Sequence, residues 1–202
     1  MKKKLMLIIA VIVVVVTGVA ALVYARSARG ARLSQEEIAV LREQYPVNDR
    51  ENPLYCRERF PVFEEDIARC DRYVVAEVVS GPDAYDRGIT PTTMFTTYEI
   101  KIVEDIFGNA SSDTIEISYN SGFDIEMPEM EIGSRFVIGG MYDEKRGEIN
   151  IGSDMIFYVT EDDYVLSVKS EETRDAHTGS RVSDLIEYIR SVKKAAQTGS
   201  AE

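Results

Sequence analysis

The side chains best suited to chemistry are two cysteines, Cys56 and Cys70, and one histidine, His177. Two thiols and one imidazole are too few for a structural zinc site, which usually takes four such ligands. Two cysteines favour one disulfide bond in an oxidising compartment and two buried thiols in the cytosol. The choice between these alternatives depends on the N-terminal segment. His177 lies in the polar stretch Glu171–Ser180, where we expect a solvated loop residue.

The other candidate ligands are carboxylates in a run of four acids, Asp124, Glu126, Glu129 and Glu131. A calcium site needs six to eight oxygen ligands, and the spacing of an EF-hand loop is absent, so a solvated loop is the better prediction. The sequence holds no nucleophile elbow, no phosphate-binding loop and no Cys/His pair in a motif context. We therefore predict no catalytic, metal-binding or cofactor-binding residues, and a protein that is not an enzyme. A hydrolase whose carboxylates meet only in the fold stays an alternative.

Charge is distributed unevenly along the 202 residues. Six of the 23 basic residues, and none of the 35 acidic ones, lie within residues 1–33. The remaining 169 residues therefore carry 17 basic and 35 acidic groups, a net charge of −18. A surface this acidic repels nucleic acid and anionic lipid, which argues against a nucleic-acid partner.

The N-terminus predicts a membrane anchor. Residues 1–4 form a basic segment, and residues 5–25 are uncharged and mostly aliphatic. As a helix these 21 residues would span about 31 Å, close to one hydrocarbon core, whereas a cleaved signal peptide has a shorter apolar centre. We expect an uncleaved signal-anchor, with a cleaved signal as the alternative. The lysines favour an inside N-terminus, so we predict a single-pass protein of the cell membrane whose C-terminal domain is extracytoplasmic.

Residues 26–55 are expected to form a juxtamembrane helix and a linker. Ser34 and Glu37 have the spacing of a capping box, in which each side chain bonds the other's backbone N–H. One face of the predicted helix, from about Gln35 to Gln44, carries Ile38, Leu41 and Tyr45. A second short amphipathic turn is predicted at Phe63–Cys70.

Short β-type runs follow, and their apolar residues alternate with polar ones. The predicted strands are Tyr73–Val79, Tyr98–Ile106, Thr114–Tyr119, Phe136–Met141, Ile149–Ile151, Met155–Val159 and Tyr164–Val168. Half-buried strands of this kind need a second layer or closure on themselves. The fold class we predict is mainly β, an OB-type Greek-key barrel over residues 56–170 with flanking helices, preceded by one N-terminal transmembrane helix.

The C-terminal part is predicted to be a helix that packs on the barrel. Its apolar residues follow the 3.6-residue period: Val182, Leu185, Ile186, Ile189 and Val192. We assign residues 171–196 to this helical region and residues 197–202 to a frayed tail.

Four segments of the predicted barrel carry a resemblance to a known family: Cys70–Ser80, Tyr98–Gly108, Arg135–Met141 and Gly147–Ile151. Over about residues 56–160 their order and spacing resemble the netrin-like (NTR) module. The likeness is nearest to the N-terminal domain of the tissue inhibitors of metalloproteinases.

This resemblance implies a function that the sequence meets only in part. In those inhibitors the first cysteine of the mature chain binds the protease zinc through its free α-amine. The matching residue here, Cys56, lies within the chain, so inhibition would require processing near Cys56. The family's disulfide framework would be reduced to one bridge, Cys56–Cys70. That bridge would close a loop of about 15 residues and be worth about 3 kcal/mol in the chain-entropy model.

The resemblance also implies a binding edge formed by Cys56–Pro61 and by the loops Ser80–Thr93 and Asn120–Pro128. Tyr85 and Phe123 are expected to be exposed aromatic anchors in those loops. The alternative is that both rings pack over the barrel ends. We therefore predict a binding module whose partner is an extracellular protein or envelope component, contacted through Cys56, Tyr85 and Phe123.

Overall fold

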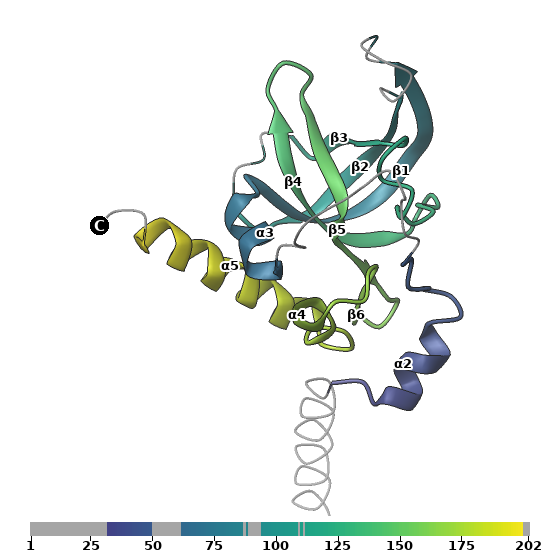
Figure 1. The fold of residues 1–202 in the computed structure, drawn as a ribbon, viewed down its shortest axis with the longest axis vertical. Helices are drawn as coiled ribbons and strands as arrows, with labels where there is room; N and C mark the ends of the chain where they lie inside the picture. Colours follow the sequence, from purple (N-terminus) through teal and green to yellow (C-terminus); the bar gives the residue numbers. More distant parts are fainter. Residues whose placement is uncertain are drawn as a thin grey trace, which may run out of the picture. The chain divides into compact units, whose positions relative to one another are not determined.

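The computed structural model describes residues 32–49, 62–86, 88, 94–108, 110 and 112–199. The chain divides into two units, Met1–Arg32 and Leu33–Glu202. The second unit is mainly antiparallel β sheet with flanking helices (Figure 1). Its strands are β1 (Arg72–Asp86), β2 (Met94–Asp105), β3 (Thr114–Asn120), β4 (Arg135–Asp143), β5 (Glu148–Val159) and β6 (Val165–Ser167).

The strands are hydrogen-bonded in the order β3-β2-β1-β4-β5-β6, and each of these neighbouring pairs is antiparallel. One further pairing joins β3 to β5, and it is parallel, with Ile117 opposite Ile149. Strand β1 lies between β2 and β4, with Val78 paired to Ile100 and Val74 paired to Ile138.

Alternate residues of β1 enter two different hydrophobic cores, because successive side chains of a strand point to opposite faces. Val74, Ala76 and Val78 are buried in what we call the sheet core. Its other members include Ile100, Ile117, Phe136, Ile138, Ile149 and Tyr158. Tyr73 and Val75 are buried in the helix core, which also holds Phe63, Ile67, Val137, Phe157, Leu185 and Ile189. Burial of each large side chain contributes about 1.5–3 kcal/mol.

The helices are α2 (Gln35–Leu41), α3 (Phe63–Arg69), α4 (Glu172–Asp175) and α5 (Val182–Gly199). The predicted capping box is confirmed: the Ser34 hydroxyl accepts from the Glu37 N–H, and the Glu37 carboxylate accepts from the Ser34 N–H. Helix α5 packs on the sheet as predicted and lies beside α3 (Figure 1). Lys193 on α5 donates to the backbone oxygen of Ala68 on α3 at 2.9 Å.

The prediction of a loop over Ser80–Thr93 is wrong for the part that the structure describes, although several residues there are exposed. Strand β1 continues to Asp86, and Tyr85 pairs with Phe95 of β2. The turn residues Gly81 and Pro82 do not end the strand, because the register shifts between Ser80 and Asp83 and absorbs them. Gly81 has a φ of 115°, a conformation that a residue with a Cβ rarely adopts.

The predicted strands Ile149–Ile151 and Met155–Val159 are one continuous strand, β5. The polar residues between them, Ser153 and Asp154, are buried, and they are paired with other segments. Ser153 donates to Glu126 at 3.2 Å, and Asp154 lies 3.2 Å from the ammonium of Lys169. Polar residues therefore interrupt the apolar pattern without interrupting the strand.

Among the described residues, no helix combines the length and the apolar character that crossing a bilayer requires. The predicted transmembrane segment, residues 5–25, lies outside the part of the chain that the structure describes, as does Cys56.

Candidate functional site

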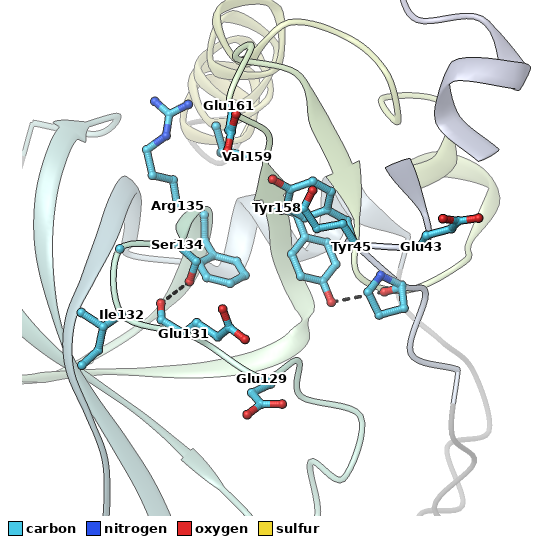
Figure 2. Close-up of a pocket in the computed structure, with 14 residues that line it drawn as sticks. Glu43, Tyr45, Glu129, Glu131, Ile132, Ser134, Arg135, Tyr158, Val159 and Glu161 are labelled. Carbon is cyan, nitrogen blue, oxygen red and sulfur yellow. Dashed lines mark hydrogen bonds between the residues drawn. The ribbon is translucent and has the colours of Figure 1, made fainter. Parts of the chain in front are cut away.

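A groove of about 520 Å³ lies beside the start of β4 and the end of β5 (Figure 2). Its volume falls within the range of about 300–1,000 Å³ that is typical of ligand sites. The lining residues are Glu43, Gln44, Tyr45, Pro46, Glu129, Glu131, Ile132, Gly133, Ser134, Arg135, Phe136, Tyr158, Val159 and Glu161. We call this site the acidic groove.

Three parts of the chain form its walls. The first is the turn that follows α2, residues 43–46, and the second is the segment before β4, residues 129–134. The third consists of the start of β4 and the end of β5, which supply Phe136 and Tyr158. Because β4 and β5 are hydrogen-bonded neighbours, with Phe136 paired to Tyr158, these two side chains have a fixed spacing.

The floor of the acidic groove is aromatic. The ring of Tyr158 lies 5.5 Å from the ring of Tyr45 and 5.5 Å from the ring of Phe136, measured between centroids. The Tyr158 hydroxyl donates to the backbone oxygen of Pro46 at 3.2 Å (Figure 2). This bond ties the wall after α2 to the end of β5, so the floor is held by packing and by a hydrogen bond.

Arg42 links the wall formed by residues 43–46 to strand β6. Its guanidinium donates to the backbone oxygen of Tyr45 at 3.2 Å and to the backbone oxygen of Ser167 at 2.7 Å. Ser167 belongs to β6 and is fully buried, so these bonds attach the turn after α2 to the sheet. Beyond it, the Asn48 N–H donates to the backbone oxygen of Val168 at 2.8 Å.

The opposite wall is fixed to β1. The Gly133 N–H donates to the backbone oxygen of Val78 at 2.8 Å, and the Val78 N–H donates to the backbone oxygen of Ser134 at 3.0 Å. The Ser134 hydroxyl donates to the backbone oxygen of Glu131 (Figure 2). Gly133 has a φ of 87°, which suits glycine, and the preceding residue, Ile132, is 69% exposed. The turn therefore presents an apolar side chain to solvent at the edge of the groove.

The rim carries four exposed carboxylates, those of Glu43, Glu129, Glu131 and Glu161. Arg135 is the only basic residue in the described lining, and its guanidinium donates to Asp163 at 2.7 Å and to the backbone oxygen of Thr160 at 2.8 Å. Burial raises the pKa of the Tyr45 hydroxyl, and the nearby Glu161 carboxylate raises it further, against the effect of Arg135. The groove therefore has a negative rim around an aromatic floor.

Tyr85, an expected contact residue, lies elsewhere. It is a half-buried residue of β1 whose hydroxyl donates to the buried Glu148 carboxylate at 2.8 Å. Its ring stacks on Phe95 at 5.6 Å, and the guanidinium of Arg146 lies 4.7 Å from its centroid. Tyr85 also borders a smaller hollow of about 330 Å³, so its role as a contact residue stays a prediction.

The other predicted contact residues are not brought into the groove. Phe123 is half-buried in the turn after β3 and is not part of the groove lining. Cys70 is fully buried, its sulfur lies 3.3 Å from the sulfur of Met155, and burial raises the pKa of its thiol to about 12. Its expected disulfide partner, Cys56, lies outside the described residues, so the bridge stays a prediction.

His177 is not the solvated loop residue that the sequence predicts. Its ring lies 4.2 Å from the ring of Tyr188 on α5 and 5.7 Å from the ring of Phe63 on α3. The acidic run also divides: Glu126 forms an ion pair with Lys169, whereas Glu129 and Glu131 are exposed on the groove rim. Among the described residues no group of three or more metal-ligating side chains is placed to hold a metal ion.

Sequence reasoning missed the acidic groove, although it identified some of its parts. It assigned Tyr45 to an apolar helix face, and it assigned Glu129 and Glu131 to a solvated loop. The sequence does contain one signal of an exposed apolar side chain at a turn: Ile132 follows the acidic segment and directly precedes Gly133. No protein-family model matches the chain, and a search of curated proteins finds none with significant similarity.

Proposed function

We propose that this protein is a non-enzymatic binding module that holds an extracellular protein or envelope component in the acidic groove. In this proposal residues 5–25 anchor it in the cell membrane as a single transmembrane helix, with the C-terminal domain on the extracytoplasmic side. The observation that carries the binding role is the groove itself. Its aromatic floor is held by the Tyr158–Pro46 hydrogen bond and by tilted ring packing, so it is formed without a ligand.

We also propose that the sheet closes into an OB-type barrel of the netrin-like kind. The support is the set of strand pairings, because β1 through β5 each have a hydrogen-bonded neighbour on two sides. Following these neighbours from β1 through β2, β3, β5 and β4 leads back to β1. Barrels of this type use their surfaces and loops for recognition, which agrees with a binding role by analogy of fold alone.

The chemistry of the groove favours binding over catalysis. Its serine, Ser134, donates its hydroxyl proton to a backbone oxygen, so it is not oriented as a nucleophile toward a base. The described lining contains no histidine or cysteine. The alternative function, inhibition of a metalloprotease after processing near Cys56, stays a prediction, because Cys56 lies outside the described residues.

A site-specific crosslink tests the binding role. We would place the photoreactive residue p-benzoylphenylalanine at Ile132, which is 69% exposed at the groove edge, in the full-length chain in its native membrane. The matched position is Val103 on β2, which is 54% exposed and outside the groove lining. We expect one discrete adduct from position 132 and none from position 103. Adducts from both positions, or from neither, would contradict the proposal.

A further inference from the structure

The acidic groove is selective in charge as well as in shape. Four carboxylates surround it, and the positive charge of Arg135 is already balanced by Asp163 at 2.7 Å. Figure 2 shows Glu129 and Glu131 on one side of the tyrosine rings, Glu43 on another, and Glu161 near the end of β5. An anionic ligand would meet repulsion from several directions, whereas a cationic ligand is attracted from all of them.

Charge alone does not describe the site, because its floor is apolar. The centroid of the Tyr158 ring lies 5.5 Å from that of Tyr45 and 5.5 Å from that of Phe136. Phe136 and Tyr158 are buried, so a ligand reaches aromatic surface mainly at the half-buried ring of Tyr45, which can pack on an apolar side chain or attract a guanidinium group. The exposed side chain of Ile132 extends this apolar surface beyond the floor. A ligand that fits both features needs cationic groups for the rim and an apolar group for the floor.

We propose that the acidic groove binds an extended segment of a partner protein in which basic residues alternate with aromatic or aliphatic ones. This inference rests on the proposed function and names the chemistry of the partner. In an extended chain successive side chains point to opposite sides, so one apolar side chain can enter the floor while its basic neighbours reach the rim. A volume of about 520 Å³ has room for a side chain and adjoining backbone, in agreement with a segment and not with a whole helix.

Binding of defined peptides to the full-length chain in detergent micelles tests this chemistry. The probe is fluorescein-labelled Arg-Phe-Arg-Phe-Arg, followed by fluorescence anisotropy, with Glu-Phe-Glu-Phe-Glu and Arg-Ser-Arg-Ser-Arg as matched peptides. We expect only the first to bind well, and the other two to bind at least about tenfold more weakly, as expected when either the charges or one apolar anchor is lost. Raising the salt from about 0.05 M to about 0.5 M should weaken binding, because exposed charges are then screened.

Matched variants separate the groove from the general acidity of the chain. Glu129→Gln with Glu131→Gln should weaken binding of the first peptide by about tenfold, since each rim charge contributes up to about 1 kcal/mol, or about fivefold. Glu144→Gln with Glu187→Gln removes the same charge from exposed positions outside the groove lining and should leave affinity within about twofold. All four sites are exposed, so both variants should unfold at the temperature of the unmodified chain.

Several results would overturn the inference. If both double variants weaken binding equally, the peptide is responding to net charge and not to the groove. If Arg-Ser-Arg-Ser-Arg binds as well as the aromatic peptide, or if spermidine displaces the aromatic peptide at the same concentration, the site takes amines and not a peptide. If position 132 crosslinks to a partner segment that lacks basic residues, the binding role stands and the partner chemistry is wrong. If position 132 gives no adduct, the binding role itself fails.

Discussion

Asp66 on α3 and Arg174 on α4 are 108 positions apart in the chain, yet their side chains form an ion pair in the protein interior. Their side chains are 1% and 3% exposed. Arg174 also donates to the backbone oxygen of Asp154 at 2.7 Å and to the Glu171 carboxylate at 2.9 Å. Burial raises the pKa of Asp66, and the hydrogen bond from Arg69 and the charge of Arg174 oppose that shift. This pair joins α3, α4 and β5.

Removing one partner of this pair should destabilise the protein strongly. Asp66→Asn would leave the buried Arg174 with Glu171 as its remaining carboxylate, and Arg174→Met would leave the buried Asp66 with the more exposed Arg69. Because the buried pair is lost in both variants, we expect the free energy of unfolding to fall by about 3 kcal/mol. The matched control is Arg190→Met, which breaks the exposed pair with Glu104 and should cost about 1 kcal/mol or less. Urea denaturation measures all three variants. Equal losses at the buried and exposed pairs would contradict the expectation.

The same substitution at two buried tyrosines should have different effects. Tyr158→Phe removes the hydrogen bond to Pro46 and should lower the free energy of unfolding by about 0.5–1.5 kcal/mol. Within the described part of the chain the Tyr73 hydroxyl is buried without a hydrogen-bond partner, so Tyr73→Phe should leave stability unchanged or raise it. Thermal unfolding compares the two, and a larger loss for Tyr73→Phe would show that its hydroxyl has a partner.

Tyr158→Phe should also affect the acidic groove. Without its bond from Tyr158, the wall after α2 is held less firmly, and ordering it upon binding carries an added entropic cost. We expect Tyr158→Phe to bind the Arg-Phe peptide more weakly at temperatures where the variant is fully folded, whereas Tyr142→Phe, on β4 outside the groove, should leave affinity unchanged. The measurement is the anisotropy titration described above.

Cys70 should make stability depend on alkaline pH under reducing conditions. Burial raises its pKa from 9.0 to about 12 in the folded protein. Because the folded state then holds a proton that the unfolded state loses, stability is unaffected below pH 9 and falls as the pH rises toward 12. The fall should approach about 4 kcal/mol at the upper end. The Cys70→Ala variant should show a shallower fall, and an unchanged slope would contradict this.

If residues 5–25 anchor the chain in the membrane, the full-length chain should fractionate as an integral membrane protein. It should remain with membranes after alkaline carbonate extraction. Val14→Arg with Val15→Arg places two charges in the middle of the segment, each costing about 2.5–3.5 kcal/mol of insertion, and should release the chain. The matched Val14→Leu with Val15→Leu variant should stay membrane-bound. Release of the unmodified chain would exclude the anchor.

Orientation needs a separate measurement. Position 144 is exposed, so Glu144→Cys supplies a reactive thiol, while Cys70 is buried. With Cys56 replaced by serine in both chains, a membrane-impermeant maleimide should label the Glu144→Cys variant in intact cells, and not the chain that keeps Glu144, if the C-terminal domain is extracytoplasmic. Labelling only after cell lysis would place that domain on the cytoplasmic side.

Much of the fold could be predicted from local patterns. The alternation in Thr114–Tyr119 and the 3.6-residue period after Val182 each reflect one buried face, which a sequence displays directly. Strand β5 was harder, because Ser153 and Asp154 look like a break until their distant partners, Glu126 and Lys169, are known. Likewise Gly81 and Pro82 are turn residues by type, and only the pairing with β2 shows that the strand continues past them.

The candidate site was less accessible to sequence reasoning for a physical reason. Tyr45 and Tyr158 are far apart in the chain, and their contact depends on how α2 attaches to the sheet. Tyr85 was expected to be an exposed anchor because of the turn residues around it, but its hydroxyl donates a hydrogen bond to the buried Glu148 carboxylate. A sequence shows which residues are aromatic or acidic, whereas their exposure is a property of the assembled sheet.

Strand β1 also determines how the protein should lose its structure. Residues of β1 alternate between the sheet core and the helix core. If one core unfolds, β1 is displaced and the other core loses the β1 side chains that pack in it. The two hydrophobic clusters should therefore behave as one cooperative unit, and spectroscopic probes placed in each should report a single coincident denaturation midpoint.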